Sequence, residues 1–340
     1  MADFNQLIKN WYRQNKRNLP WRHTKDPFKI WLSEIILQQT KVEQGLSYYL
    51  KFTNRFETVE DLAITSEQEV LNLWQGLGYY SRARNLHFTA KTVVNVYKGR
   101  FPETYTELMK LKGIGSYTAA AIASFCFDES VAVVDGNVYR VLSRVFDLEI
   151  AIDSTEGKKY FFELAQNLID QEEPALFNQA IMEFGALQCV PKNPNCEMCP
   201  LDSICLSKAN GTWTNRPVKS KKTLVKHRFF HFLIFQKDQT TYLQKRSEKD
   251  IWQNLFQFPL IETEENLEMN DFEKYSLSPP NKISAEIVHV LSHQKIHARF
   301  YHFNQLPTNI DSDWIPVSMA EIQDFPIPRL IDRYLETESY

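Results

Sequence analysis

This sequence has no long apolar run, no strong charge imbalance and no glycine after Gly211. No segment has the roughly 18 consecutive apolar residues that a membrane-spanning helix needs, and the start, MADFNQLIKN, lacks the apolar stretch of a signal peptide. We therefore expect a cytoplasmic protein with no membrane segment. The net charge of −3 gives no overall preference for nucleic acid, so any binding to DNA has to use local basic surfaces.

All ten glycines lie at or before Gly211, and this absence of later glycine divides the chain. Before that point, segments such as WLSEIILQQT and VYRVLSRVF carry the apolar spacing of helices. After it, HRFFHFLIF and FQFPLIE are typical of strands, and IPRLIDRYLETE is typical of a last helix. We predict a mainly helical region over 1–212, a basic linker over 213–227 and a smaller α+β domain over 228–340.

Acidic residues are absent from 82–100 and from 203–237, two stretches that contain several lysines and arginines. Such local positive charge suits contacts with DNA phosphates. An ordinary solvated surface has the same composition, so both interpretations stay open for each stretch.

Cysteine is scarce, but four of the five cysteines fall within 17 residues, with the spacing C-x6-C-x2-C-x5-C from Cys189 through Cys196 and Cys199 to Cys205. In a reducing compartment, clustered thiols bind metal more often than they form disulfides. Four thiolates in a short loop suit one zinc ion or one [4Fe–4S] cluster, and the spacing leaves both open. Cys126 stands alone.

Two glycine-containing segments are candidates for contacts with DNA. In LKGIGSYTAAAIASF, Gly113 and Gly115 permit a tight turn between two helices, and the free N–H groups of the second helix suit a phosphate. The alternative is an ordinary helical corner. In LWQGLGYYSRARNL, residues 73–86, tyrosines beside arginines suit base wedging, and the alternative is a packing contact.

Two carboxylates are candidates for catalysis. Glu34 lies among Ile30, Trp31 and Leu37 on a predicted helix, where desolvation raises a carboxyl pKa toward that of a general acid. Asp135 follows an apolar run and precedes a helix, so it faces a developing positive charge or simply caps the helix. For Glu34 the alternative is a buried structural carboxylate with a basic partner.

Taken in order over roughly 5–210, these segments resemble the helix–hairpin–helix DNA glycosylase superfamily. The resemblance implies a six-helix barrel with a cluster subdomain, a helix–hairpin–helix at about 105–126, and a [4Fe–4S] cluster on the cysteine loop 189–205 rather than zinc.

Within the superfamily, the sequence most resembles the MutY-type adenine DNA glycosylases. Glu34 stands at the position of their acid, Tyr117 replaces the catalytic lysine of bifunctional relatives, and a long C-terminal extension is present. The resemblance implies a monomeric, monofunctional enzyme, cytoplasmic or associated with the nucleoid, that removes adenine opposite 8-oxoguanine or guanine in double-stranded DNA. The alternatives are an endonuclease III-like bifunctional glycosylase and AP lyase, or a non-catalytic damage-binding protein.

The resemblance also implies residue roles at the reacting sugar. Glu34 protonates the adenine ring, and Asp135 stabilises or bonds to the oxocarbenium sugar. Asn137 orients the reacting groups, and Tyr117 packs beside the sugar.

Further roles concern the bases. Arg22 and Gln179 are expected to contact the flipped adenine, and Gln39 and Tyr79 to wedge at the opposite base.

The C-terminal domain resembles the Nudix-like module that senses 8-oxoguanine, with Ser292 and His293 in its recognition loop. The loop departs from the family pattern at Leu291, where many relatives have phenylalanine. Because glycine is absent and EENLEMNDFEKY does not match the glutamate-rich helix of Nudix hydrolases, we expect this domain to recognise and not to hydrolyse.

Overall fold

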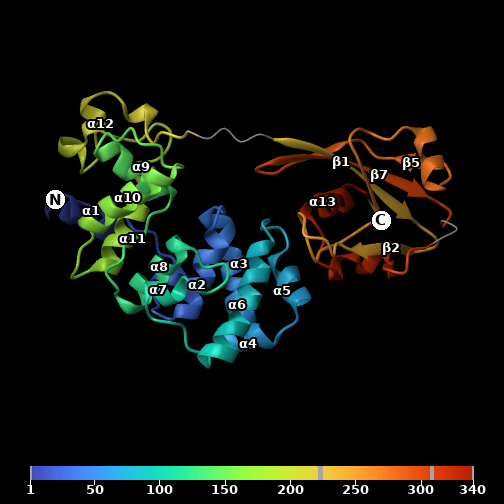
Figure 1. The fold of residues 1–340 in the computed structure, drawn as a ribbon, viewed down its shortest axis with the longest axis horizontal. Helices are drawn as coiled ribbons and strands as arrows, with labels where there is room; N and C mark the ends of the chain where they lie inside the picture. Colours follow the sequence, from blue (N-terminus) through green and yellow to red (C-terminus); the bar gives the residue numbers. More distant parts are fainter. Residues whose placement is uncertain (1, 221–224, 307–309, 339–340) are drawn as a thin grey trace. The chain divides into compact units, whose positions relative to one another are not determined.

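The chain folds into two compact units, one helical and one mixed (Figure 1). The computed structural model describes residues 2–220, 225–306 and 310–338. The first unit combines 1–64 with 85–221, and the second combines 65–84 with 222–340. A helical segment in the middle of the chain therefore groups with the C-terminal residues. In the described part of the chain, no helix is long and apolar enough to cross a membrane.

The first unit is built from α-helices joined by short turns, as the sequence predicts. Its elements are α1 (Ala2–Asn15), the 3₁₀ turn η1 (Pro20–Arg22), α2 (Pro27–Leu37), α3 (Val42–Arg55), α4 (Val59–Ile64), α7 (Tyr105–Leu108), α8 (Ser116–Phe127), α9 (Gly136–Val145), α10 (Thr155–Leu168), α11 (Pro174–Leu187), η2 (Asp202–Ile204), α12 (Leu206–Ala209) and η3 (Trp213–Asn215). Helix α6 (Ser81–Tyr97) starts in the second unit and ends in the first.

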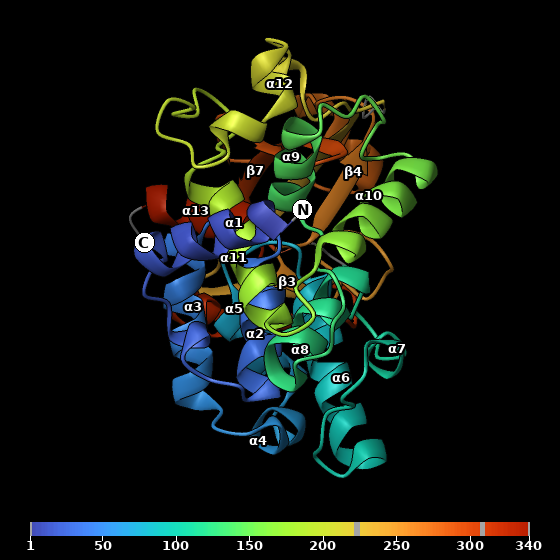
Figure 2. The same cartoon turned by 90° about the vertical axis from the view of Figure 1, so that its left-hand side faces the viewer.

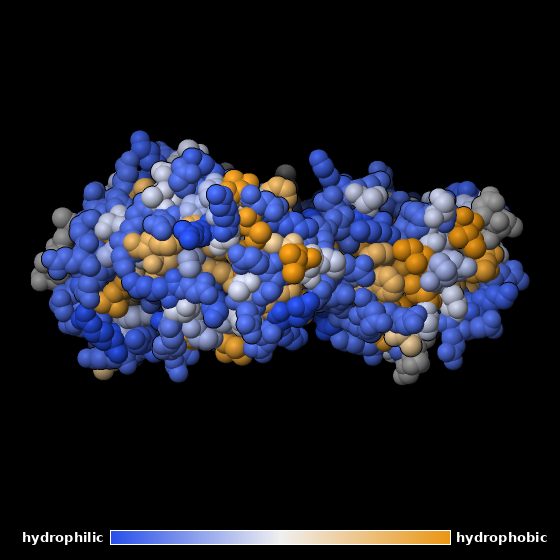
Figure 3. All heavy atoms as spheres, turned by 90° about the horizontal axis from the view of Figure 1, so that it is seen from below, coloured by the Kyte–Doolittle hydropathy of each residue, from blue (hydrophilic) through white to orange (hydrophobic). Residues whose placement is uncertain are grey.

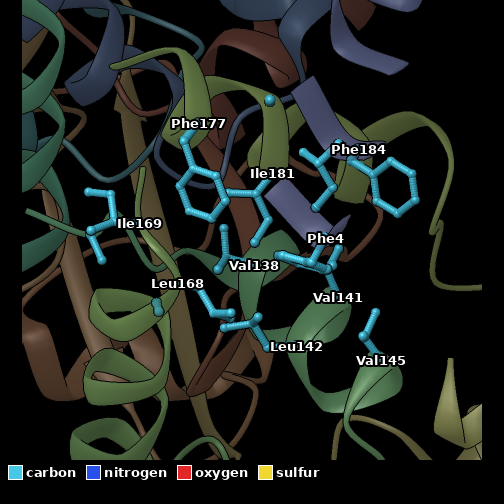
Figure 4. Close-up of a cluster of buried hydrophobic side chains, with 14 of the residues drawn as sticks. Phe4, Val138, Val141, Leu142, Val145, Leu168, Ile169, Phe177, Ile181 and Phe184 are labelled. Atoms are coloured by element: carbon cyan, nitrogen blue, oxygen red, sulfur yellow. The ribbon is translucent and has the colours of Figure 1, made fainter. Parts of the chain in front are cut away.

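One hydrophobic core holds α1, α9, α10 and α11 together. Phe177, Ile181 and Phe184 of α11 meet Val138 and the following apolar residues of α9 (Figure 4). Figure 2 shows α1 beside α11, in agreement with their many contacts. This packing fixes the start of α9, where Asp135 lies. On the face seen in Figure 3, hydrophobic side chains form separate patches among hydrophilic ones.

Local sequence explains where the helices near the site begin. The Asp26 side chain accepts a hydrogen bond of 2.9 Å from Phe28 N, and Pro27 follows it as the first residue of α2. Helix α2 is buried from Phe28 to Ile36 apart from Lys29. Glu34 therefore sits inside the protein because its whole helix does.

A tight hairpin joins α7 to α8. Gly113 has φ +79°, and a Cβ atom added to it would lie 2.6 Å from Asn85 Cβ, so both its backbone and its surroundings require glycine. Gly115 is the N-cap residue of α8, with φ −90° and open space around it. Helix α7 is short and ends at Leu108.

The second unit contains α5 (Glu67–Trp74) and two sheets, which confirms the mixed character predicted for the C-terminal part. One sheet has the order β4-β1-β7-β5 with β6 also paired to β7, and the other has the order β3-β2-β8. The strands are β1 (Lys226–Phe235), β2 (Thr240–Lys245), β3 (Phe256–Gln257), β4 (Leu260–Thr263), β5 (Lys282–Ile283), β6 (Ile287–Val290), β7 (Gln294–Phe303) and β8 (Trp314–Ser318). The 3₁₀ helices η4 (Met269–Tyr275) and η5 (Met319–Asp324) and the helix α13 (Arg329–Thr337) complete it.

Strands β1 and β7 run parallel over their full lengths, from Lys226 opposite Gln294 to Phe235 opposite Phe303. The turn between β6 and β7 consists of Leu291, Ser292 and His293, and it closes through a hydrogen bond of 2.8 Å from Leu291 N to Gln294 O. Ser292 and His293 are exposed. The segment EENLEMNDFEKY forms only the 3₁₀ helix η4.

Candidate active site

A cavity of about 420 Å³ in the first unit gathers most of the predicted catalytic and adenine-binding residues. Helices α2, α8, α9 and α11 and the turn η1 contribute to its lining. The predicted residues on its wall are Arg22, Glu34, Tyr117, Asp135, Asn137 and Gln179.

Glu34 is buried in this cavity, with 5% of its surface exposed. Burial raises the pKa of Glu34 to about 7, and the charge of Asp135 adds to this effect. A hydrogen bond donated by the Tyr117 hydroxyl to Glu34 Oε2 and the charge of Arg22 oppose it. Near neutral pH the carboxyl group is therefore available in its protonated form, as a general acid requires.

Asp135 is the N-cap residue of α9 and also lines the cavity. Its Oδ1 accepts hydrogen bonds from Asn137 N at 2.9 Å and Val138 N at 2.8 Å, and its Oδ2 accepts one from Asn137 Nδ2 at 2.8 Å. Burial raises the pKa of Asp135, while these hydrogen bonds and the charge of Arg140 oppose the shift.

Arg140, which the sequence analysis missed, connects Asn137 to the cysteine loop. Its Nη2 donates to Asn137 Oδ1 at 2.9 Å, and its Nε donates to Cys189 O at 2.7 Å. The arginine lies on α9 one turn after Asn137, so helical spacing was the signal that could have identified it.

Glu183 is the second residue that the sequence analysis missed, and it is 1% exposed on the cavity wall. Arg22 donates to both of its carboxylate oxygens at 2.8 and 2.6 Å, and Arg17 does so at 3.0 and 2.6 Å. Burial alone disfavours the charge, but the hydrogen bonds from Arg22 and Arg17 outweigh it and lower the pKa of Glu183 to about 2. On α11 it follows Gln179 by four residues, on the same helix face.

Gln179 is oriented by Tyr12, whose hydroxyl donates to Gln179 Oε1 at 2.7 Å. Because this bond occupies the amide oxygen of Gln179, the amide nitrogen remains as a donor for a ligand. The cavity wall thus contains an amide, an arginine and an ionised carboxylate.

The structure does not bring the predicted wedge residues into this cavity. Gln39 and Tyr79 are both exposed, and both adopt left-handed backbone conformations, with φ of 57° and 48°. Left-handed conformations of residues other than glycine are strained and often occur at functional sites. Gly113 and Gly115 are likewise exposed on the hairpin outside the cavity.

Tyr79 belongs to the second unit together with the predicted recognition loop. Its hydroxyl and Ser292 Oγ are 2.5 Å apart. Tyr79, Leu291, Ser292 and His293 line a pocket of about 220 Å³ with Trp252 and neighbouring residues.

The four clustered cysteines surround a separate cavity of about 30 Å³ in the first unit. Arg144 anchors the loop, since its Nη1 donates to Cys189 Sγ at 3.4 Å and to Val190 O at 2.8 Å. Within the described ranges, no group of three or more ligating side chains is placed to hold a single metal ion. Four thiols on one small cavity are nevertheless the donor set that a [4Fe–4S] cluster needs.

Comparison with known proteins identifies the family. The family described as HhH-GPD superfamily base excision DNA repair protein matches residues 32–169, and the NUDIX domain family matches residues 230–337. The adenine DNA glycosylase of Buchnera aphidicola subsp. Baizongia pistaciae is 38% identical over 326 residues, which cover 94% of this chain and 88% of that protein. The chain belongs to the adenine DNA glycosylase family. It is therefore a DNA glycosylase with a Nudix-like C-terminal domain, which confirms the predicted enzyme class and fold class.

Other relatives match a smaller share of the chain. The human adenine DNA glycosylase is 43% identical over 211 residues, or 59% of this chain and 39% of that protein. A thermostable thymine-DNA glycosylase structure superimposes with a TM-score of 0.57 at 32% identity, covering 61% of this chain and 95% of the other. An endonuclease III–DNA complex gives a TM-score of 0.52 at 22% identity, with 61% and 94% covered, and shows the fold alone.

Proposed function

We propose that this protein hydrolyses the bond between adenine and deoxyribose in duplex DNA where adenine stands opposite 8-oxoguanine or guanine. The observation that carries the proposal is the juxtaposition of Glu34, Tyr117 and Asp135 in one cavity of about 420 Å³. Because duplex DNA hides the glycosidic bond, the adenine nucleotide enters this cavity after flipping out of the stack.

Glu34 donates its proton to a ring nitrogen of adenine, and the C1′–N bond breaks with its electron pair leaving on the base. Asp135 faces the positive sugar and stabilises it by charge or by a transient bond to C1′. Water then adds to C1′ and gives a proton to the Glu34 carboxylate, which restores the acid. Asn137 fixes the Asp135 carboxylate through its hydrogen bond of 2.8 Å, and Tyr117 orients Glu34.

Adenine recognition uses Gln179 and Arg22 on the wall of the same cavity. The Gln179 amide nitrogen donates to a ring nitrogen of the base, and Arg22 contacts the base from η1. Glu183 stays ionised between Arg17 and Arg22, and its hydrogen bonds hold the Arg22 guanidinium in place on the cavity wall.

The reaction is monofunctional, because lyase chemistry by this family's lysine route needs an amine nucleophile and Tyr117 has none. Borohydride trapping on abasic duplex DNA tests this point. Efficient covalent capture of the protein would favour the bifunctional alternative.

Recognition of the opposite base falls to Gln39, Tyr79, Ser292 and His293. The two wedge residues are exposed on strained backbone, and Ser292 and His293 are exposed at a hairpin tip. Leu291 contributes apolar contact without an aromatic ring. The Nudix-like domain acts here as a reader of 8-oxoguanine, and the predicted domain limits 1–212, 213–227 and 228–340 are retained as part of this proposal.

Cys189, Cys196, Cys199 and Cys205 hold a [4Fe–4S] cluster that stiffens the loop and takes no part in hydrolysis. Arg144 and Arg140 support the proposal because both hold this loop through backbone carbonyls. Iron analysis and the visible spectrum of the purified protein test it, since zinc without iron would overturn the cluster assignment.

One experiment tests the whole proposal. The protein is incubated with duplexes that carry adenine opposite 8-oxoguanine, adenine opposite guanine, or thymine glycol, and abasic sites are scored. We expect release of adenine from the first two duplexes. Gel filtration in parallel is expected to show a monomer. Release only from thymine glycol duplexes would instead support the endonuclease III-like alternative.

A further inference from the structure

We infer that a second cavity, beside the catalytic one, binds a backbone phosphate next to the flipped nucleotide. This inference rests on the proposed function. The cavity has a volume of about 410 Å³ and lies in the first unit. Its lining consists of Gly136, Asn137, Arg140, Arg144, Ile152, Pro191, Arg216, Pro217 and Lys219.

The charge of this lining is one-sided. Among the residues that the structure describes, the wall contains four cationic side chains and no carboxylate. Arg140, Arg144 and Arg216 are buried, with 9%, 3% and 7% of their surfaces exposed, and Lys219 is exposed. A concave surface whose charged groups are all cations has a concentrated positive potential and favours the binding of an anion.

Among the described residues, neither arginine of α9 pairs directly with a carboxylate, although the charge of Arg140 also acts on Asp135. Arg140 donates to Cys189 O and Gly185 O, and Arg144 donates to Val190 O, Pro191 O and Trp213 O. Carbonyl oxygens satisfy the N–H groups without cancelling the positive charge, unlike carboxylates. Arg144 also donates to Cys189 Sγ, so part of its charge faces the cysteine loop.

Arg216 differs, because it pairs with two acids. Its Nε lies 2.9 Å from Asp147 Oδ1, and its Nη2 lies 2.9 Å from Glu149 Oε1. Those acids do not line the cavity. Arg216 therefore serves as part of the wall, and Lys219 supplies an exposed positive charge at the cavity.

The backbone on both sides of Lys219 is held in place. Ile152 N donates to Val218 O at 3.0 Å, and Asp153 Oδ1 accepts from Ser220 N at 2.9 Å and Ser220 Oγ at 3.1 Å. The backbone of Lys219 is thus held at the cavity before DNA binds, which reduces the conformational entropy that the protein loses on binding. This residue belongs to the acid-free stretch 203–237, whose role the catalytic cavity does not explain.

The location defines the ligand. Asn137, Arg140 and Pro191 line both this cavity and the catalytic one, so the two are neighbours. A nucleotide whose sugar faces Asp135 carries a phosphate on its 5′ side and another on its 3′ side. One of these phosphodiesters is the anion that the second cavity takes, and the contact positions the sugar against Asp135.

The test couples Lys219→Ala to removal of one phosphate charge. Affinity is measured for duplexes with a non-hydrolysable adenosine analogue opposite 8-oxoguanine, with a neutral methylphosphonate on its 5′ or its 3′ side. Lys158→Ala, which removes an exposed lysine of α10 in the same unit, is the matched control.

For the normal duplex, we expect Lys219→Ala to weaken binding several-fold and to reduce the slope of log affinity against log salt by about 0.9, the value for one phosphate contact. One of the two methylphosphonates should weaken binding of the unaltered protein but cause little further loss in the variant. Lys158→Ala should behave as the unaltered protein does.

Additive losses for both methylphosphonates, or equal effects of Lys158→Ala and Lys219→Ala, would overturn the inference. The proposed function is judged separately by adenine release from the unaltered protein. If release occurs and the losses are additive, only the phosphate assignment fails. If no adenine is released from either mispair, the proposed function fails.

Discussion

Replacing Glu34 by glutamine removes the proposed proton donor while keeping the size of the side chain. Because general acid catalysis contributes about 10²- to 10⁴-fold to rates, we expect Glu34→Gln to slow adenine release by at least about 100-fold. Binding to a duplex with a non-hydrolysable analogue should change little. Single-turnover measurement of abasic sites checks the rate, and an unchanged rate would refute the acid role.

The pH dependence of the unaltered protein gives a second measure of the same group. The pKa of Glu34 is about 7, so kcat/KM should fall tenfold per pH unit once the pH rises above about 7. A profile that stays flat from pH 6 to 9 would contradict the assignment of the proton to Glu34.

Stability should respond to the same pKa with a defined sign. The pKa of Glu34 is about 7 in the folded protein instead of 4.5, and at 1.36 kcal/mol for each unit this amounts to about 3 kcal/mol. The unfolded chain ionises first, so the free energy of unfolding should fall between about pH 4.5 and 7 and level off above. Glu34→Gln removes this fall, and chemical denaturation at pH 5 and 8 measures the difference.

Four further predictions follow from single contacts. Tyr117→Phe deletes a hydrogen bond that lowers the pKa of Glu34, so the fall of kcat/KM should move to higher pH; a move to lower pH would contradict this geometry. Gly113→Ala should lower the free energy of unfolding by about 2 kcal/mol, because of its positive φ and the contact with Asn85, and thermal melts measure this loss. The same variant should weaken DNA binding, which titrations measure. Gly115→Ala is the comparison variant and should lose less stability, since the space around Gly115 is open and only its N-cap position is affected. Arg144→Met should yield purified protein with less iron, since the loop loses its bonds to Cys189 Sγ and Val190 O; full iron occupancy would argue against this anchoring. Deletion after Trp213 should reduce the preference for 8-oxoguanine over guanine, whereas equal loss on both mispairs would count against the reader role.

Local pattern was sufficient for several features of the molecule. The apolar neighbours of Glu34 predicted a buried carboxylate, and it is 5% exposed. The position of Asp135 before a helix predicted an N-cap, and its side chain accepts two backbone hydrogen bonds from α9. Both follow from spacing along one helix, which is information that a single sequence contains.

Contacts between distant segments were not predictable in the same way. Glu183 was identified only from its contacts with Arg17 and Arg22, which are more than 160 residues away in the chain. The grouping of residues 65–84 with the C-terminal part also depends on tertiary packing and has no local signal. Helical patterns identified the elements, while the partners of buried charges required the folded structure.

Asp135 caps α9, and in the proposed mechanism it also faces the sugar, so that folding and the proposed chemistry depend on one carboxylate. Asparagine is as good an N-cap as aspartate, while valine is a poor one. A chain with Asp135→Asn should therefore remain folded and still occupy mispairs that it no longer repairs, and so shield them from an active copy in the same cell. A chain with Asp135→Val should be lost through misfolding and leave those mispairs accessible. The two substitutions at Asp135 should therefore have different effects in a cell: Asp135→Asn should block repair by an active copy, whereas Asp135→Val should behave as if the protein were absent.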